Sequence, residues 1–372
     1  MPVWIFLVAT LYVSGPACAT GAAPAPAPHL ALLLPLKSPV FGGAADVVRQ
    51  GFLAAAGSLP QALPVKVYEC GDESAEVVAL YLRALKAGAV AVAGPLTRDG
   101  VEALANYSGI EVPTLALNVA EKDGAERLYY FGLQAEAEAR QAARLAAAAG
   151  LRKAIIVSSG TPLAARLSLA FAEEWERRGG SVAREIVYRD DPAVFAELPV
   201  VTGGMVFLAA DAETARLIRP YLDIALPVYA TSYVFGGNAS LLLNYDLNDI
   251  HFVDMPWMLQ PDHPAVMVYP RALPPLSQEK ERLYALGVDA FRLLQIMLNN
   301  TLRTSLPLDG VTGRITLNAR RQFEREAIPA QFRFGLGLTP EAMAEAMRNA
   351  ASGVFPSMPA SAVPAASAVP AQ

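Results

Sequence analysis

The stretch HLALLLPL, residues 29–36, decides the fold because it is a short run of apolar residues without polar alternation. Such a run is typical of a parallel strand whose two faces are both covered by helices. The same pattern recurs along the chain, and we expect further strands at Pro64–Cys70, Ala89–Ala93, Val112–Leu117, Lys153–Ser158, Met205–Ala209 and Pro227–Ala230.

Helices are expected between these strands, because a glycine follows each intervening segment and can adopt the left-handed conformation beyond a helix end. These segments are Ala44–Ala56, Ser74–Ala87, Thr97–Tyr107, Gln134–Ala149 and Pro162–Arg178. Leu283–Leu298 carries an apolar stripe at helical spacing, and Thr339-Pro340 is typical of a helix start. Strand–helix repetition predicts parallel sheets with right-handed crossovers.

Composition limits the function. The chain has 372 residues, of which 53% are hydrophobic and 17% charged, with a net charge of −5. This length suffices for two lobes, and the charge gives no basic surface for nucleic acid. Two cysteines and three histidines are too few for a disulfide framework or a metal cluster. The common catalytic and nucleotide-binding motifs are missing. We therefore expect a protein without enzymatic activity, cofactor or metal.

The N-terminus is typical of an exported protein. No charged residue precedes Lys37, and Val3–Val13 is apolar but shorter than the roughly 20 residues that span a membrane. Residues 1–19 are interpreted as a signal peptide and residues 20–28 as an Ala/Pro linker. Two processing routes stay open. Cleavage after Ala19 gives a soluble protein, whereas lipidation of Cys18 gives a lipoprotein whose only membrane attachment is that anchor.

The expected fold class is α/β, with two parallel-sheet, Rossmann-like lobes. Strand–helix alternation weakens after Ala230 and an irregular stretch extends to Leu276, which indicates that the chain crosses back between lobes. We expect lobe one at about 29–132 and 256–318, and lobe two at about 133–255 and 319–336. A short helix is expected at 337–351, and an Ala/Pro/Ser-rich disordered tail at 352–372.

Several blocks in order resemble one family. They are Gly94-Pro95-Leu96, Pro113-Thr114-Leu115-Ala116-Leu117-Asn118, Ala230-Thr231-Ser232, Asp254-Met255-Pro256-Trp257, Arg282-Leu283-Tyr284-Ala285-Leu286-Gly287 and Leu308-Asp309-Gly310-Val311-Thr312-Gly313-Arg314. Together they cover about residues 29 to 336. The chain resembles the penicillin-binding-protein activator (LppC/LpoA) family, whose domain has a type I periplasmic-binding-protein fold.

This resemblance implies a periplasmic lipoprotein anchored to the outer membrane, with two lobes joined by three crossing strands. It implies a function without catalysis, namely binding and activating a bifunctional penicillin-binding protein during peptidoglycan synthesis. Longer family members carry a helical-repeat domain ahead of this fold. The alternative is the solute-binding protein of an ABC importer for an amino acid or a similar small polar ligand, because both classes share the fold.

Polar residues after the strands are the candidates for a ligand-binding cleft, since ligands of parallel sheets meet the carboxyl ends of the strands. They are Ser38, Thr97, Asn118, Ser159, Thr161, Thr231 and Ser232. Their hydroxyl and amide groups suit a small polar ligand. The alternative is that the same side chains cap helices.

Three residues are candidates for contact with a partner protein: Trp257, Arg320 and Arg321. Trp257 could instead pack beneath a hinge. The two arginines belong to a basic stretch that also includes Arg314, Arg325 and Arg333. The alternative for this stretch is a solvated helix face.

Overall fold

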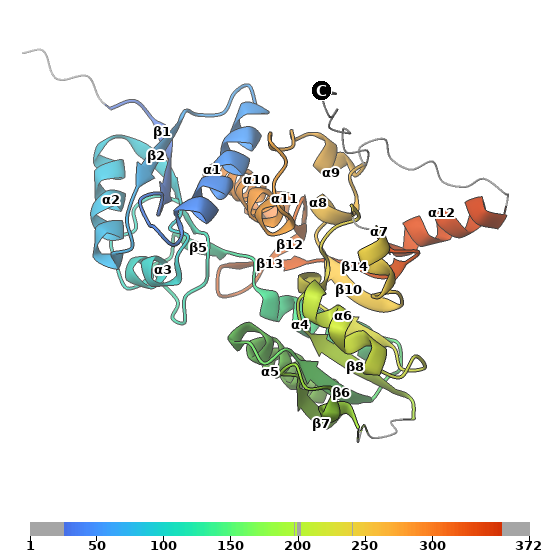
Figure 1. Ribbon diagram of the computed structural model, residues 1–372. Coiled ribbons are helices and arrows are strands. Elements are labelled where there is room, and N and C mark those ends of the chain that lie inside the picture. The colour runs from blue at the N-terminus through green and yellow to red at the C-terminus, as the bar shows by residue number, and fades with distance from the viewer. Residues whose placement is uncertain (1–25, 197, 199–201, 240, 352–372) are drawn as a thin grey trace, which may run out of the picture.

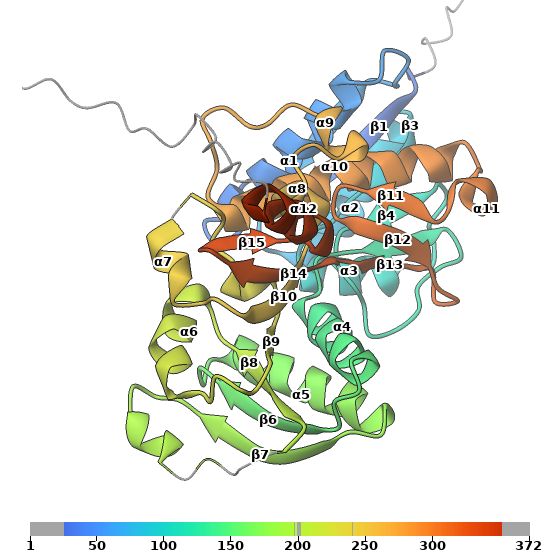
Figure 2. The same cartoon turned by 90° about the vertical axis from the view of Figure 1, so that its right-hand side faces the viewer.

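The computed structural model describes residues 26–196, 198, 202–239 and 241–351. It contains two α/β lobes, each built on one mostly parallel sheet (Figures 1 and 2). The predicted fold class is therefore confirmed. The expected signal peptide with Cys18, most of the linker and the expected tail lie outside the described residues.

The first sheet has eight strands. From one edge to the other they are β11 (Leu308–Gly310), β12 (Gly313–Leu317), β13 (Gln322–Glu326), β5 (Leu128–Phe131), β4 (Thr114–Ala116), β3 (Ala89–Ala93), β1 (His29–Leu34) and β2 (Val65–Glu69). The strand β1 is buried along its whole length, as its unbroken apolar run predicts. Its even-numbered leucines face α1 (Gly42–Gly57) and α10 (Gln278–Leu298), and its other face packs on α2 (Ser74–Lys86) and α3 (Arg98–Ala105).

The second sheet has seven strands. From edge to edge they are β15 (Leu336–Leu338), β14 (Ile328–Arg333), β10 (Ile250–Asp254), β9 (Val228–Ala230), β8 (Gly204–Ala209), β6 (Lys153–Ser158) and β7 (Ser181–Val187). Helices α4 (Ala135–Ala148) and α5 (Pro162–Arg177) cover one face. The other face is covered by α6 (Ala212–Ile218) together with the 3-10 turns η1 (Pro192–Phe195), η2 (Arg219–Tyr221) and η3 (Ser232–Val234).

Four of the helices have only four or five residues. They are α7 (Leu241–Tyr245), α8 (Pro256–Leu259), α9 (Pro264–Met267) and α11 (Leu302–Ser305). The described part of the chain ends in the longer α12 (Pro340–Ala351). The chain passes between the sheets three times: from β5 to α4, from β10 to α8, and from β13 to β14. Each lobe is therefore built from separate stretches of chain.

One lobe boundary was predicted wrongly. Residues 319–336 were assigned to lobe two as a whole, but β13 pairs with β5 and β12 in the first sheet. The reason is a hairpin: Leu317 pairs with Phe323, and the turn between them contains Arg321 with φ 58°. The chain returns along β12 before it crosses, so the third crossing lies at Ala327. The expected helix at 337–351 also begins later, because residues 337–338 belong to β15.

The basic stretch does not form a helix face. Arg314, Arg325 and Arg333 lie on the strands β12, β13 and β14. Eight strands, β5, β7 and β10 to β15, were not expected from the sequence. The longest of them, β7, is largely exposed, and the others have three to six residues, so none has the long apolar run that identified the predicted strands.

Helices α1 and α10 pack very closely through two glycines. A Cβ at Gly51 would lie 2.0 Å from the carbonyl oxygen of Tyr284, and a Cβ at Gly287 would lie 2.2 Å from that of Val48. Since both obstacles are backbone atoms, the space cannot be regained by rotating a side chain. The two glycines therefore set the distance between the helices.

We expect Gly51→Ala to lower the free energy of unfolding by about 2–3 kcal/mol, because the helices must separate to admit the methyl group. Gly43→Ala, in the same helix, is the matched control, since a Cβ there meets nothing within 4 Å. It should be neutral or slightly stabilising. Urea unfolding of both variants checks this, and equal stabilities would contradict the close packing.

His251 on β10 gives the fold a dependence on pH. Its ring stacks on Tyr229 at 4.8 Å between centroids, and Nε2 lies 3.3 Å from Nε2 of Gln331. Burial lowers the pKa of His251, Arg333 lowers this pKa further, and Asp249 raises it. The folded protein therefore holds the imidazole neutral at a pH where the unfolded chain already binds a proton.

Because the unfolded state binds more protons in this window, stability contributed by His251 falls as pH falls through the unfolded value near 6.5. We expect the free energy of unfolding to fall more steeply between about pH 7 and pH 5 in the unmodified protein than in His251→Gln. Urea titrations at a series of pH values measure the two slopes. Identical slopes would show that His251 does not contribute.

Candidate functional site

The predicted cleft residues of the first lobe make local hydrogen bonds. The hydroxyl of Ser38 accepts from the backbone N–H of Phe41 at 2.8 Å. Thr97 caps α3 by accepting from the N–H of Gly100 at 3.3 Å. The amide of Asn118 donates to the carbonyl of Leu96 at 3.1 Å and accepts from the N–H of Val119.

The predicted cleft residues of the second lobe also make local hydrogen bonds, with the exception of Ser232. Thr161 caps α5 and lies 3.3 Å from the hydroxyl of Ser159, and Thr231 caps the turn η3. Helix and turn capping therefore occupies most of the seven, and ligand binding by them stays a prediction. Ser232 is the exception, because its backbone belongs to a network that joins the lobes.

The centre of that network is a buried ion pair. Asp254, at the end of β10, is fully buried, and its Oδ2 lies 2.6 Å from Nη2 of Arg282 on α10. The same nitrogen donates to the carbonyls of Ser232 at 3.0 Å and Phe235 at 2.9 Å. A helix packed in lobe one thus holds the second crossing strand and a turn of lobe two.

Burial and pairing act in opposite directions on these two groups. Burial raises the pKa of Asp254, and the Arg282 guanidinium opposes this rise. Burial lowers the pKa of Arg282, but the charge and hydrogen bond of Asp254, together with the charges of Glu138 and Glu279, raise this pKa by more. Arg282 therefore stays charged, and losing its counter-charge would leave an uncompensated cation in the interior.

A second buried pair extends the network to the third crossing. Glu138 on α4 accepts from Nη2 of Arg325 on β13 at 2.5 Å, and each side chain is only 5% exposed. The other oxygen of Glu138 accepts from the N–H of Ser232 at 3.0 Å. One turn further along α4, Gln141 donates to the carbonyl of Ala327 at 2.7 Å and accepts from its N–H at 3.0 Å.

The network ends at the loop between β11 and β12. Arg325 Nη1 donates to the carbonyl of Thr312 at 3.4 Å. Asp289 on α10 is fully buried and accepts from the N–H and the hydroxyl of Thr312 at 2.8 and 2.7 Å. We call the set Asp254, Arg282, Ser232, Glu138, Arg325, Thr312 and Asp289 the interlobe network. It joins both lobes through hydrogen bonds that are shielded from water.

We expect Asp254→Asn to lower the free energy of unfolding by about 3–5 kcal/mol, because the buried Arg282 loses its counter-charge. Arg320→Ala is the control. It removes a surface pair with Asp123, in which Arg320 is 55% exposed, and should cost less than about 1 kcal/mol. Urea unfolding compares the two. Similar losses would mean that the Asp254 pair does not hold the lobes.

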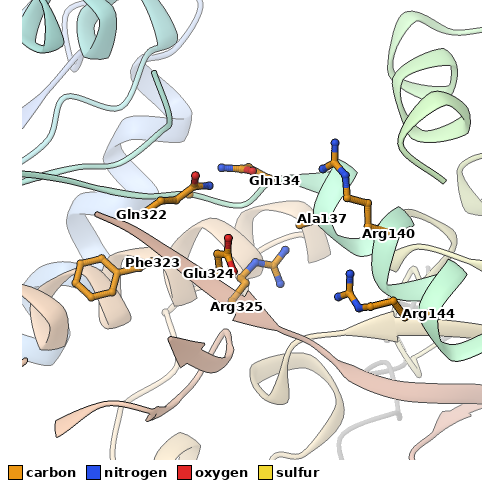
Figure 3. A pocket seen from close by; sticks show the side chains of 9 residues that line it. Gln134, Ala137, Arg140, Arg144, Gln322, Phe323, Glu324 and Arg325 are labelled. Atoms are coloured by element: carbon orange, nitrogen blue, oxygen red, sulfur yellow. The ribbon is translucent and has the colours of Figure 1, made fainter. Parts of the chain in front are cut away.

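A polar pocket of about 360 Å³ lies beside the network (Figure 3). It is lined by Gly132, Gln134, Ala137, Arg140 and Arg144 from the first crossing and α4, and by Gln322, Phe323, Glu324 and Arg325 from β13. None of the seven predicted cleft residues lines it. Arg325 joins pocket and network, and its buried Nε–H has no hydrogen-bond partner among the described residues, which costs about 1–3 kcal/mol.

Trp257 does not reach the surface. It is 1% exposed, its Nε1 donates to Glu281 at 2.6 Å, and the Arg271 guanidinium lies 3.8 Å from the ring centroid. Its backbone N–H donates to the carbonyl of Val311. Trp257 therefore packs beneath the second crossing, and its assignment as a partner contact is wrong.

The two arginines of the β12–β13 turn differ. Arg320 is exposed and pairs with Asp123 at 2.9 Å. Arg321 is half-buried, and its guanidinium donates to the carbonyls of Leu128 and Gly124. Arg321 therefore fixes the turn, whereas Arg320 is exposed and its guanidinium also donates to the carbonyl of Glu121 at 2.9 Å.

Three other features bear on function in the part of the chain that the structure describes: metal sites, reactive cysteines and membrane-spanning helices. No cluster of three or more His, Cys, Asp or Glu there could hold a metal ion. Cys70 is buried, and burial raises the pKa of its thiol, which disfavours the reactive thiolate. Nor does any helix in these residues have the length and apolarity to cross a membrane.

A chain that crosses three times between two α/β lobes has the architecture of a type I periplasmic binding protein. A family model described as "LppC putative lipoprotein" matches residues 24–198 and 202–335. Because this match covers more than half of the chain, the chain belongs to that family.

Curated relatives of this chain are named as activators of a penicillin-binding protein. The penicillin-binding protein activator LpoA of Photobacterium profundum is 25% identical over 355 residues, covering 84% of this chain and 57% of its own. The LpoA of Edwardsiella piscicida is 27% identical over 317 residues, covering 73% and 45%. The chain thus spans about half the length of these relatives.

Solved structures agree with the fold. The C-domain of LpoA from Haemophilus influenzae, described as a regulator of PBP1A, is 25% identical with a TM-score of 0.68, covering 84% of this chain and 99% of its own. A structure from Chromobacterium violaceum, described as a "putative branched-chain amino acid ABC transporter", is 36% identical with a TM-score of 0.70, covering 82% and 99%.

The interlobe network was not predicted from the sequence, although part of it lies in segments that the sequence singles out. Asp254, Arg282 and Thr312 all stand in the blocks that carry the family resemblance. For two other polar residues, Glu138 and Gln141 of α4, nothing in the sequence indicates that they join the lobes. They lie three positions apart on one face, but the helix contains other charged residues that are only partly buried.

Proposed function

We propose that this chain binds a bifunctional penicillin-binding protein and raises its activity without chemistry of its own. The observation that carries the proposal is family membership across both lobes, together with relatives that are named activators and a regulator of such enzymes. The proposed location is the periplasm, with anchoring to the outer membrane through lipidated Cys18. The family description, which names a lipoprotein, supports this location.

The proposed mechanism is a shift in the conformational population of the synthase. A partner that binds the active conformation more tightly than the inactive one stabilises the active one by that difference in affinity. A tenfold difference corresponds to about 1.4 kcal/mol. The interlobe network suits this task, because a rigid binding surface loses little conformational freedom on association.

The surface that we propose for the contact includes Arg320. It lies in the turn between β12 and β13 and is exposed, and its carboxylate partner Asp123 is also exposed. An exposed pair contributes little to folding, so its charges can be redirected to an acidic partner at low cost.

The test measures glycan polymerisation and crosslinking by a purified bifunctional synthase, with and without the full chain. We expect both rates to rise. Arg320→Glu should weaken association roughly tenfold, since a favourable rim charge becomes a repulsive one. Arg166→Glu is the matched control, because Arg166 is 62% exposed and also forms one ion pair, with Glu136. It should bind as the unmodified chain does.

Unchanged synthase rates and no detectable association would contradict the proposal. Tight binding of a free amino acid under the same conditions would then favour a solute-binding protein of an importer. Association that is equally weakened by both variants would instead remove Arg320 from the contact surface and leave the activator function standing.

A further inference from the structure

The pocket beside the interlobe network contains guanidinium groups whose donors are poorly used. Arg140 and Arg144 lie one turn apart on α4, and both line the pocket (Figure 3). Arg140 lies 3.8 Å from Glu173, and Arg144 lies 4.0 Å from Glu174, distances too long for hydrogen bonds. Glu174 is already held by two arginines of its own region, Arg177 and Arg178.

The charge of the pocket is positive but not uniform. Its lining contains three guanidinium groups against one carboxylate, that of Glu324. Glu138, directly behind the lining, neutralises Arg325. Arg140 and Arg144 face the one carboxylate of the lining across the pocket, and their ion-pair partners Glu173 and Glu174 do not line it. The amides of Gln134 and Gln322 add further polar groups.

We propose that this pocket binds a small acidic ligand, with its carboxylate or phosphate group on Arg140 and Arg144 and an N–H or O–H group on Glu324. A guanidinium can hold either anion through two parallel hydrogen bonds, so both sources have the same chemistry. The cavity of about 360 Å³ is at the small end of the range of ligand pockets. A concavity of this size favours a free small molecule over a folded segment of a partner.

Such a ligand would connect the two lobes. Arg140 and Arg144 belong to a helix that packs on the second sheet, whereas Gln322, Glu324 and Arg325 belong to a strand of the first. Because the ligand contacts both, its affinity depends on how the lobes are placed, and binding favours the arrangement that brings α4 and β13 together. This site differs from the seven polar residues predicted at the strand ends.

Isothermal titration of the full chain at low salt tests the proposal with three probes. The dipeptide Ala-Glu supplies carboxylates, glycerol 2-phosphate supplies a phosphate, and Ala-Gln amide lacks both. We expect binding of at least one anionic probe and none of the amide. Arg140→Gln and Arg144→Gln should each weaken binding roughly tenfold, since each removes charge-assisted hydrogen bonds.

Arg177→Gln is the matched control, because Arg177 also contacts Glu174 but does not line the pocket. It should keep its affinity within about twofold. Glu324→Gln should weaken the binding of Ala-Glu, since the ammonium group of this dipeptide loses the carboxylate that holds it. Which anionic probe binds decides between the two sources of the anion.

Two results would overturn the proposal. One is the absence of binding by both anionic probes, and the other is binding that Arg140→Gln and Arg144→Gln leave unchanged. If the probes do not bind while these variants lose the synthase, the pocket receives an acidic segment of the partner instead. No synthase is present in the titrations, so failure here and failure of the proposed activator function remain distinguishable.

Discussion

The buried pair of Asp254 and Arg282 is the constraint on which the arrangement of the two lobes depends. Neither charge can be taken out of water unless the other accompanies it, so the end of β10 and the start of α10 must meet. The remaining donor capacity of Arg282 is directed to carbonyls of the turn after β9, in the other lobe. A displacement of one lobe against the other therefore breaks charge-assisted hydrogen bonds in a water-excluded environment, where they are hard to replace.

Several residues of the blocks that carry the family resemblance contribute to this constraint in the structure. The block around Asp254 supplies the carboxylate, and the block that begins at Arg282 supplies both the guanidinium and Gly287, which admits α1. The block from Leu308 to Arg314 supplies Thr312, which Asp289 holds. These segments are far apart in sequence but meet at the crossings between lobes. These segments therefore hold the two lobes in place. Any effect that they have on function would act through the placement of the lobes.

Much of the fold could be predicted from the sequence, because its signals are local. An unbroken apolar run such as residues 29–34 has to be buried on both faces, and this alone indicates a parallel sheet. The crossings were harder, since they depend on pairings between distant residues. Nothing local shows that β13 pairs with β5 before the chain leaves the first sheet. The candidate site was predicted least well, because a hydroxyl after a strand is equally suited to a ligand and to a helix cap, and here capping occupies most of them.

Arg325 shows how the network and the pocket can influence each other. Its Nη atoms donate to Glu138 and Thr312, which belong to different lobes, and its side chain also lines the pocket. An anion placed beside this guanidinium would compete with Glu138 for it, and Glu138 also holds the backbone of Ser232. The turn after β9 is in turn held by Arg282. A continuous series of hydrogen bonds therefore connects the pocket to the second crossing. A change at the pocket and a change at the crossings would both alter the placement of the two lobes.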